Sequence, residues 1–400
     1  MISKMAKRLL LLLTNLAICL IASVVADRVA RPFLPKHGAG LIFPTNTTRH
    51  FQTPEFSFTV KTNSLGFRDR EFSGQKSARI RILALGDSFT YGWGVEIDQS
   101  WPKILEQRLR NAGLDVEIAN LGKPAGSPRS YADIAERAVP ALKPDLLIVA
   151  VLQGDDLAQM ELPPQPETNQ EQIADASIKY PRARALAKRL YPNFLALLDE
   201  RENSEAVLAN QWKREAQIFL SVFTPEEKAR LENIDARARK AFLNGELNPA
   251  LVYLSIHQPE YFLQTLDANS AKVRTLVSKT AEQFARIKNV AQRNNADVLI
   301  VSMPYGMYVN SASLKSRERL GFTSAPEMLT TNAEDEAIRT ACQMAGVRFY
   351  DYTREFRQES IQRDLFFELD GHINAQGHNY FAEVIAPMIK QSITEAPGAE

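Results

Sequence analysis

Short apolar runs alternate along this chain with longer segments whose apolar residues recur at helical spacing. The apolar runs lie at Ile80–Leu85, Val116–Ala119, Asp145–Leu152, Asp297–Ser302 and Val347–Tyr350. The third run is apolar almost throughout, which is typical of a strand that helices cover on both faces. Strands alternating with helices in this way predict an α/β fold, with a doubly wound, flavodoxin-like parallel sheet of about five strands.

Amphipathic segments between and after these runs predict the helices that flank the sheet. They lie at Gln99–Ala112, Tyr131–Leu142, Ser270–Asn294, Glu334–Ala345 and Gln376–Ile393. Gly113 and Pro144 follow the first two segments, and both residue types commonly end helices. The last segment closes the predicted domain.

The alternation is interrupted between the third and the fourth run. Residues 158–268 begin with a proline-rich stretch at 161–168 and then show helical spacing with little sign of strands. The helical patterns cover Ala183–Leu198, Ala206–Phe223, Glu226–Leu243 and Asn248–Leu263. We interpret them as a helical insertion that divides the core into residues 79–157 and 269–394. Such an insertion either shapes substrate access or extends the structure without touching ligand. The polar segment 306–332 is a second candidate cover of the site.

Residues 1–26 carry the pattern of an export signal. Lys7 and Arg8 precede an apolar stretch from Leu9 to Ala26, which is long for a signal peptide and just long enough to span a bilayer. A cleaved signal and a retained anchor both export the rest of the chain. We therefore expect a periplasmic or extracellular protein that contacts the membrane only through this segment, if it is retained.

Residues 27–78 form a polar extension rich in proline and glycine. Phe56–Thr62 alternates apolar and polar residues, which predicts a short strand, and Asn63–Gly66 is a turn signal. This extension is either an edge hairpin packed on the core or a lip of the active-site cleft.

Composition narrows the classes of function. A formal net charge of +1 gives no electrostatic basis for binding nucleic acid. Two cysteines, Cys19 and Cys342, cannot make a disulfide framework, and no group of Cys and His has zinc-ligand spacing. We therefore expect neither a metal nor a cofactor.

Asp87 and Ser88 follow the first predicted strand, at the edge where open α/β sheets bind ligands. A serine hydroxyl attacks an ester only with a general base in reach, and Asp370 and His372 near the C-terminus supply an acid and a base. A hydrolytic triad is defined by geometry rather than by chain order. The alternative is that these residues merely turn the chain or cap helices, with His378 as the other nearby histidine.

The sequence resembles the SGNH (GDSL-like) esterase and acyltransferase family at four motifs. They are Gly86-Asp87-Ser88, Asn120 to Gly126, Gly154-Asp155-Asp156 and Asp370-Gly371-His372, followed by Asn374 and Gly377-His378. The resemblance implies Ser88 as nucleophile, His372 as base and Asp370 as the acid that orients it. The family commonly spaces the last pair as Asp-x-x-His. The shorter spacing here resembles a branch that includes polysaccharide acetyltransferase-like members.

The resemblance also implies donors for an oxyanion. The backbone N–H of Ser88 is one, and the second motif gives Gly126, with Gly122 and Ala125 as alternatives. The third motif normally offers an Asn amide, but this chain has Asp155. Asp155 is therefore protonated, or Gln153 supplies the amide, or catalysis is weak or lost. We favour Gln153 because its amide is a donor at any pH.

Together these patterns predict an exported serine esterase that works through a Ser-His-Asp triad and an acyl-enzyme. By analogy, its substrate is an ester-bearing small molecule or an O-acetylated polysaccharide of the envelope. The alternatives are an O-acyltransferase on a cell-surface polysaccharide and a non-catalytic binding protein that retains the fold. A structural envelope protein that interacts through the insertion is a further alternative.

Overall fold

The computed structural model describes residues 4–30, 40–161, 186, 189–194 and 207–394. The chain divides into two compact units, residues 1–36 with 165–206 and residues 37–164 with 207–400. Most of the predicted proline-rich stretch at 161–168 and most of the predicted helix at 183–198 lie outside the described residues.

The first unit contains the N-terminal helix α1, Lys4–Ala30. Its window Leu11–Val29 is long and apolar enough to cross a membrane, a property that a signal sequence shares. Asp27 in its last turn accepts hydrogen bonds from the backbone N–H of Phe194 at 2.7 Å and from the Asn193 side chain at 3.1 Å. The buried carboxylate thus ties the short segment at 189–194 to this helix.

The second unit is built on a five-stranded parallel sheet with the strand order β4-β3-β5-β6-β7. The strands are β3 (Ile80–Gly86), β4 (Val116–Gly122), β5 (Leu146–Leu152), β6 (Asp297–Met303) and β7 (Arg348–Tyr350). In order along the chain this is the flavodoxin-like 2-1-3-4-5 pattern. The predicted doubly wound α/β fold is confirmed. Each of the five predicted strands overlaps an observed strand.

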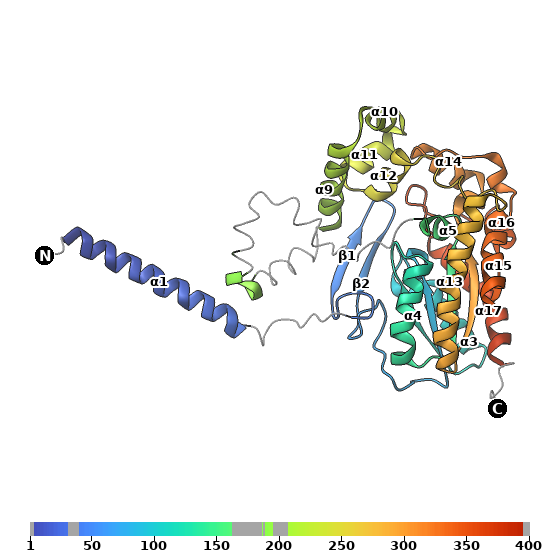
Figure 1. Ribbon diagram of the computed structural model, residues 1–400, viewed down its shortest axis with the longest axis horizontal. Helices are drawn as coiled ribbons and strands as arrows, with labels where there is room; N and C mark the ends of the chain where they lie inside the picture. The colour runs from blue at the N-terminus through green and yellow to red at the C-terminus, as the bar shows by residue number, and fades with distance from the viewer. Residues whose placement is uncertain (1–3, 31–39, 162–185, 187–188, 195–206, 395–400) are drawn as a thin grey trace. The chain divides into compact units, whose positions relative to one another are not determined.

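Each face of the sheet carries its own apolar layer because side chains alternate along a strand. Ile82 and Ile148 point to the face covered by α3 (Trp101–Asn111) and α17 (Ala375–Thr394). Leu83 and Leu147 point to the opposite face. The helices on that second face are α4 (Pro128–Leu142), α13 (Ala271–Arg293) and α15 (Ala333–Ala345), as Figure 1 shows.

The N-terminal extension forms a hairpin rather than a single strand. The predicted strand is β2 (Ser57–Lys61), and it pairs in antiparallel register with β1 (Thr48–Gln52). Arg68, which follows the hairpin, is buried and donates to the carbonyl oxygens of Gly92 and Val95, both at 2.7 Å. This guanidinium fixes the extension against the loop that follows the first sheet strand.

The described part of the insertion is helical, as its apolar spacing indicates. It contains α9 (Val207–Val222), α10 (Pro225–Asn233), α11 (Ala236–Asn244) and α12 (Pro249–His257). The predicted single helix Glu226–Leu243 is two helices, because Asp235 caps α11 by accepting from the backbone N–H groups of Arg237 and Ala238.

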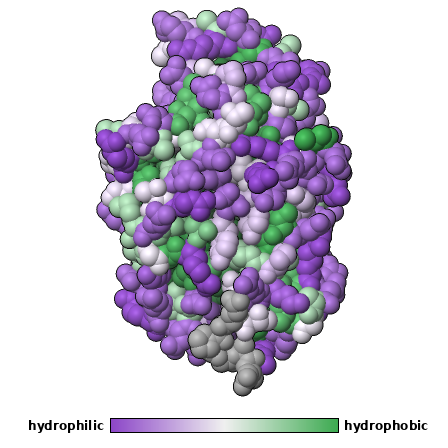
Figure 2. Space-filling model, turned by 90° about the vertical axis from the view of Figure 1, so that its right-hand side faces the viewer, coloured by the Kyte–Doolittle hydropathy of each residue, from purple (hydrophilic) through white to green (hydrophobic). Residues whose placement is uncertain are grey.

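The segment 306–332 contains α14 (Ser311–Arg319), which lies between the short 3-10 helices Gly306–Tyr308 and Pro326–Leu329. Asn310 caps α14 by accepting from the N–H of Ser313. The face of the molecule drawn in Figure 2 is mostly hydrophilic, with apolar residues scattered over it. This is the surface expected where helices turn their polar sides to water.

Candidate active site

Ser88 lies where β3 ends and the short helix α2 (Ser88–Tyr91) begins. Asp87 caps this helix, since its carboxylate accepts the N–H of Phe89 at 2.9 Å. Gly86 is required for the tight entry, because a Cβ there would lie 2.1 Å from Thr90 Oγ1 and 2.9 Å from the carbonyl oxygen of Ala150. As the first residue of the helix, Ser88 has a backbone N–H without an intrahelical acceptor.

Ser88, His372 and Asp370 lie together, although the serine and the acid are 282 positions apart along the chain. The Ser88 hydroxyl is 2.7 Å from His372 Nε2. On the other side of the ring, His372 Nδ1 hydrogen-bonds to Asp370 Oδ1. The His372 side chain is 17% exposed and that of Asp370 only 4%, so the acid is shielded while the base remains accessible.

The short Asp370-Gly371-His372 spacing depends on its glycine. Gly371 has φ +85°, a conformation that other residues adopt only with strain, and a Cβ there would lie 2.7 Å from the Arg317 guanidinium carbon. Burial by itself raises the pKa of Asp370, but the charge and hydrogen bond of His372, with Arg317 nearby, outweigh it and hold the pKa below its ordinary value. Asp370 is therefore ionised, and it is placed where its charge would stabilise a protonated His372 imidazole.

Two aromatic rings lie beside the His372 imidazole. Phe89 lies with its ring centroid 4.8 Å from that of His372, and Trp93 lies at 6.1 Å. Trp93 in turn stacks at 6.1 Å on Trp212, a buried residue of α9. The insertion thus reaches the immediate surroundings of the histidine. Sequence reasoning did not single out these rings, because aromatic residues are equally common in ordinary cores.

The second motif does not offer the expected glycine donor. The N–H of Gly126 donates to the carbonyl oxygen of Lys123 at 2.8 Å, and the N–H of Gly122 donates to Asn120 Oδ1 at 2.9 Å. Ala125, with φ +55°, has no hydrogen-bond acceptor for its N–H within the described part of the chain. Of the three candidates in this motif, Ala125 is therefore the one with a free donor.

Gln153 is engaged elsewhere. Its amide nitrogen donates to Asp335 Oδ1 at 2.9 Å and to Thr353 Oγ1 at 2.6 Å. Its amide oxygen accepts the backbone N–H of Tyr305 at 3.1 Å. Both amide hydrogens are consumed in a buried network, so the expectation that Gln153 serves an oxyanion is not supported by this geometry.

Asp155 begins α5 (Asp155–Gln159) and is held by two donors. The Tyr261 hydroxyl donates to its Oδ1 at 2.9 Å, and Gln159 Nε2 donates to its Oδ2 at 2.6 Å. Burial raises the pKa of Asp155, although Tyr261, Gln159 and the charge of His372 each oppose the shift. The raised pKa makes the neutral acid, which can donate a hydrogen bond, easier to form than in an ordinary aspartate.

Two further acids, Asp87 and Asp156, are buried near Ser88. Burial raises the pKa of Asp87 to about 7, against the opposing charge of His372. Asp156 accepts from the Tyr131 hydroxyl at 2.9 Å and from the N–H of Leu152 at 2.8 Å, and burial together with Asp87 raises its pKa well above the ordinary value. Both are structural supports of the loops that carry Ser88 and Asp155.

His378 is not paired with Ser88. It is fully buried, and its Nδ1 accepts the backbone N–H of Trp101 at 3.2 Å. Burial lowers the pKa of His378 to about 3, so it stays neutral and cannot serve as a base that must take up a proton near neutral pH.

The family follows from the sequence match. The model of the GDSL-like lipase/acylhydrolase family matches residues 84–299, more than half of the 400-residue chain. The chain belongs to this family. It is accordingly an ester-hydrolysing enzyme. Its core is the five-stranded parallel sheet described above. No curated protein matches the chain.

Several solved structures are similar to this GDSL-like chain at low identity. TesA is 10% identical, covers 78% of this chain and 98% of its own length, and has a TM-score of 0.38. The acetyl xylan esterase AlAXEase is 10% identical over 78% of this chain and 100% of its own, with a TM-score of 0.37. The psychrotrophic esterase EstA from Pseudoalteromonas sp. is 8% identical over 79% and 99%, with a TM-score of 0.38.

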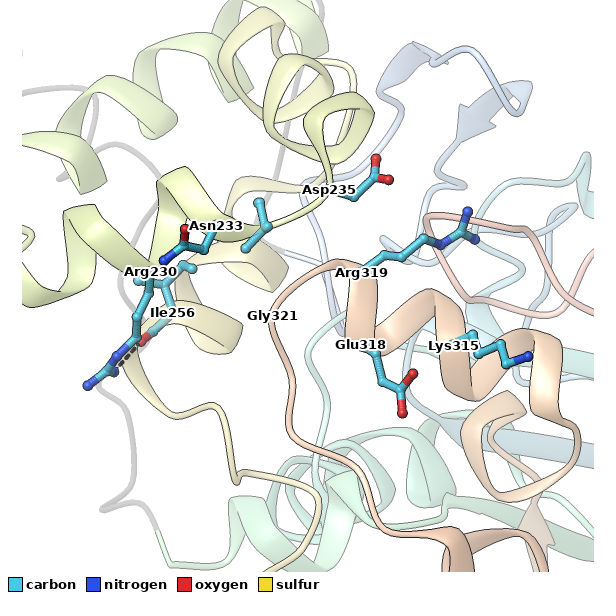
Figure 3. Close-up of a pocket in the computed structure, with 9 residues that line it drawn as sticks. Arg230, Asn233, Asp235, Ile256, Lys315, Glu318, Arg319 and Gly321 are labelled. Atoms are coloured by element: carbon cyan, nitrogen blue, oxygen red, sulfur yellow. Dashed lines mark hydrogen bonds between the residues drawn. The ribbon is translucent and has the colours of Figure 1, made fainter.

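A separate pocket of about 750 Å³ lies between the insertion and α14. Figure 3 shows Lys315, Glu318 and Arg319 along α14 on one side, and Arg230 and Ile256 of the insertion on the other. Its lining includes none of the three triad residues. Among the residues that the structure describes, no group of three or more His, Cys, Asp or Glu side chains is arranged to hold a metal ion.

Proposed function

We propose that this protein is an exported serine esterase that forms an acyl-enzyme at Ser88. The observation that supports it best is the continuous path from Ser88 Oγ through both nitrogens of His372 to Asp370. In the first half-reaction Ser88 Oγ attacks the ester carbonyl carbon while His372 Nε2 takes the hydroxyl proton. Collapse of the tetrahedral intermediate breaks the bond to the alkoxy oxygen, which leaves as an alcohol with the proton from His372.

The second half-reaction returns the enzyme to its starting state. His372 removes a proton from water, the hydroxide attacks the acyl carbon, and Ser88 leaves with the proton held on Nε2. The products are a carboxylic acid and the free serine. Asp370 stays ionised throughout and stabilises the imidazolium that forms in each half-reaction.

The oxyanion is stabilised by the backbone N–H groups of Ser88 and Ala125 and by neutral Asp155. Ser88 begins a helix and Ala125 lacks another acceptor in the described residues, so both N–H groups are unused. Asp155 takes the place of the usual Asn of the family, and its raised pKa favours the form that can donate. This proposal replaces Gly126 and Gln153, whose hydrogens are engaged with Lys123, Asp335 and Thr353.

The substrate is an ester of the cell envelope, with O-acetylated polysaccharide as the leading class. Support comes from the apolar N-terminal helix, which fits export, and from Trp212 and Tyr261 of the insertion, which approach the site. A sugar hydroxyl in place of water would make the same acyl-enzyme an O-acyltransferase. The short Asp370-Gly371-His372 spacing, which resembles that of acetyltransferase-like members, favours this second candidate.

A fluorophosphonate probe tests the proposal directly, because it reacts covalently only with an activated serine. We expect the wild-type chain to be labelled at Ser88 and to release p-nitrophenol from p-nitrophenyl acetate. Ser88→Ala is the matched control and should do neither. A wild-type chain that is folded but neither labelled nor active would overturn the esterase proposal and support a binding protein. Adding acetylated and free oligosaccharides then separates transfer from hydrolysis by the products formed.

A further inference from the structure

The tip of the N-terminal hairpin contacts the loop that carries the catalytic acid. Glu55 lies in the turn between β1 and β2, where Thr53 Oγ1 accepts the backbone N–H groups of Glu55 and Phe56 at 3.2 Å. From there, Glu55 Oε1 accepts the N–H of Leu369 at 2.8 Å and Oε2 accepts the N–H of Asp370 at 2.8 Å. One carboxylate thus binds two successive peptide units of the catalytic loop.

Arg317 of α14 binds the same two residues from their carbonyl side. Its guanidinium donates to the carbonyl oxygen of Asp370 at 3.2 Å and also to that of Leu369. The side chain is buried, with 2% of the residue exposed. The N–H groups of Leu369 and Asp370 therefore lie on the two carboxyl oxygens of Glu55, and their C=O groups lie on the guanidinium of Arg317.

We propose that Glu55 and Arg317 are positioning residues that hold Asp370 against His372. This inference rests on the proposed triad. The loop needs such support because Asp370 precedes Gly371, which lies at φ +85° and, as a glycine, restricts the backbone less than any other residue type would. Catalytic side chains must be held to within about 0.5 Å, and a displacement of about 1 Å can cost roughly 10²-fold in rate.

Side-chain chemistry makes both residues specific for this task. Two parallel N–H groups require two acceptor oxygens, and a glutamine in place of Glu55 would set its own NH₂ against one of them. Two carbonyl groups require the fork of an arginine, whereas a lysine is a single point donor. A mere anchor for the hairpin would not need this match, because the ring of Phe56 already packs on Phe367 with centroids 5.0 Å apart.

The test compares Glu55→Gln and Arg317→Lys in the full chain with two matched controls. Glu96→Gln alters an acid that also bonds the hairpin, since Glu96 Oε1 accepts the N–H of Thr59 at 2.9 Å, but that does not contact the catalytic loop. Lys315→Met alters a cation of α14 that is among the residues lining the separate pocket. For each variant, kcat and KM on p-nitrophenyl acetate, the pH profile of kcat/KM, the labelling rate at Ser88 and the thermal midpoint are measured.

We expect Glu55→Gln and Arg317→Lys to lower kcat by about 10–10²-fold with little change in KM, and to slow labelling equally. A loosened Asp370 stabilises the imidazolium less, so the acidic limb of the profile should move to lower pH. Both controls should keep wild-type values.

Two results would overturn the inference while leaving the triad intact: wild-type kcat and pH profile in both variants, or losses that are equal at every pH and match the loss of folded protein. A wild-type chain without Ser88-dependent activity would instead remove the proposed function, and this inference with it.

Discussion

The hydroxyl of Tyr261 donates to Asp155 Oδ1 at 2.9 Å, and so joins the segment that follows α12 to the acid that begins α5. Gln159 donates to the other oxygen at 2.6 Å. These two donors fix the plane of the carboxyl group, and in the neutral form its own hydrogen is the one left to donate. Tyr261 of the insertion therefore contacts Asp155, the residue that stands where the family normally has an asparagine.

Asp155→Asn replaces a titrating group with a permanent donor of nearly the same shape. If neutral Asp155 donates to the oxyanion, the wild-type enzyme should gain activity as the pH falls and the carboxyl is protonated. The variant should lose this dependence and exceed the wild type at neutral pH, by at most about 10²–10³-fold, the contribution of one oxyanion donor. The pH profiles of kcat for both proteins measure it.

The alternative donor, Gln153, is tested by a second variant. Gln153→Ala should lower stability, because it leaves Asp335 and Thr353 without a buried partner, while kcat per folded molecule stays near that of the wild type. A loss of about 10²–10³-fold in kcat at unchanged stability would return the donor role to Gln153.

Tyr261→Phe should move the pH profile of kcat toward higher pH. The Tyr261 hydrogen bond lowers the pKa of Asp155, so its removal raises that pKa and keeps the acid neutral to higher pH. The activity that depends on neutral Asp155 should then persist to higher pH than in the wild type. Tyr253→Phe, another tyrosine of the insertion, is the control. A profile that moves to lower pH would contradict the assignment.

The core of the fold was predictable because its signals are local. The runs that became β3, β5 and β6 are apolar over consecutive residues, and α13 repeats its apolar residues at helical spacing. The break between α10 and α11 escaped prediction, because Asp235 caps a new helix inside a pattern that reads as continuous.

The candidate site was predictable only in part, because its supports are not local. Glu55 lies more than 300 residues before the loop that it binds, and Gln153 finds its partners 182 and 200 residues away. A motif indicates which residues take part in the chemistry. It does not indicate which distant residues accept their hydrogen bonds or position the loops that carry them. For that reason the sequence did not show that the Gln153 amide is engaged elsewhere, and Glu55, Arg317 and Tyr261 were not singled out.

Ser88→Ala and His372→Ala should each reduce kcat by about 10³-fold or more, with little further loss in the double variant. Members of a triad act as a unit, so their losses do not add. His378→Ala is the matched control: it should lower the free energy of unfolding by about 1–3 kcal/mol while the folded fraction keeps its activity. If His378→Ala abolishes activity and His372→Ala barely lowers it, the base is misassigned.

Export can be checked with a reporter fused after residue 60, beyond α1. Lys7 and Arg8 followed by the apolar stretch should carry the reporter across the membrane, so alkaline phosphatase fused there should be active. The same fusion lacking residues 1–26 should be inactive. An inactive full fusion together with an active cytoplasmic reporter at the same point would contradict export.

Glu334 gives the fold a predicted dependence of stability on pH. It is buried in the first turn of α15, and burial raises its pKa from 4.5 to about 7. Between these values the folded state holds a proton that the unfolded state has lost. The free energy of unfolding should therefore fall as the pH rises through this window and level off above it.

Glu334→Gln, which stays neutral, should flatten that part of the curve when urea unfolding is followed at a series of pH values. Glu336→Gln changes an exposed acid on the same helix and should leave the slope unchanged. A wild-type slope in Glu334→Gln would show that this carboxyl is ionised in the folded protein.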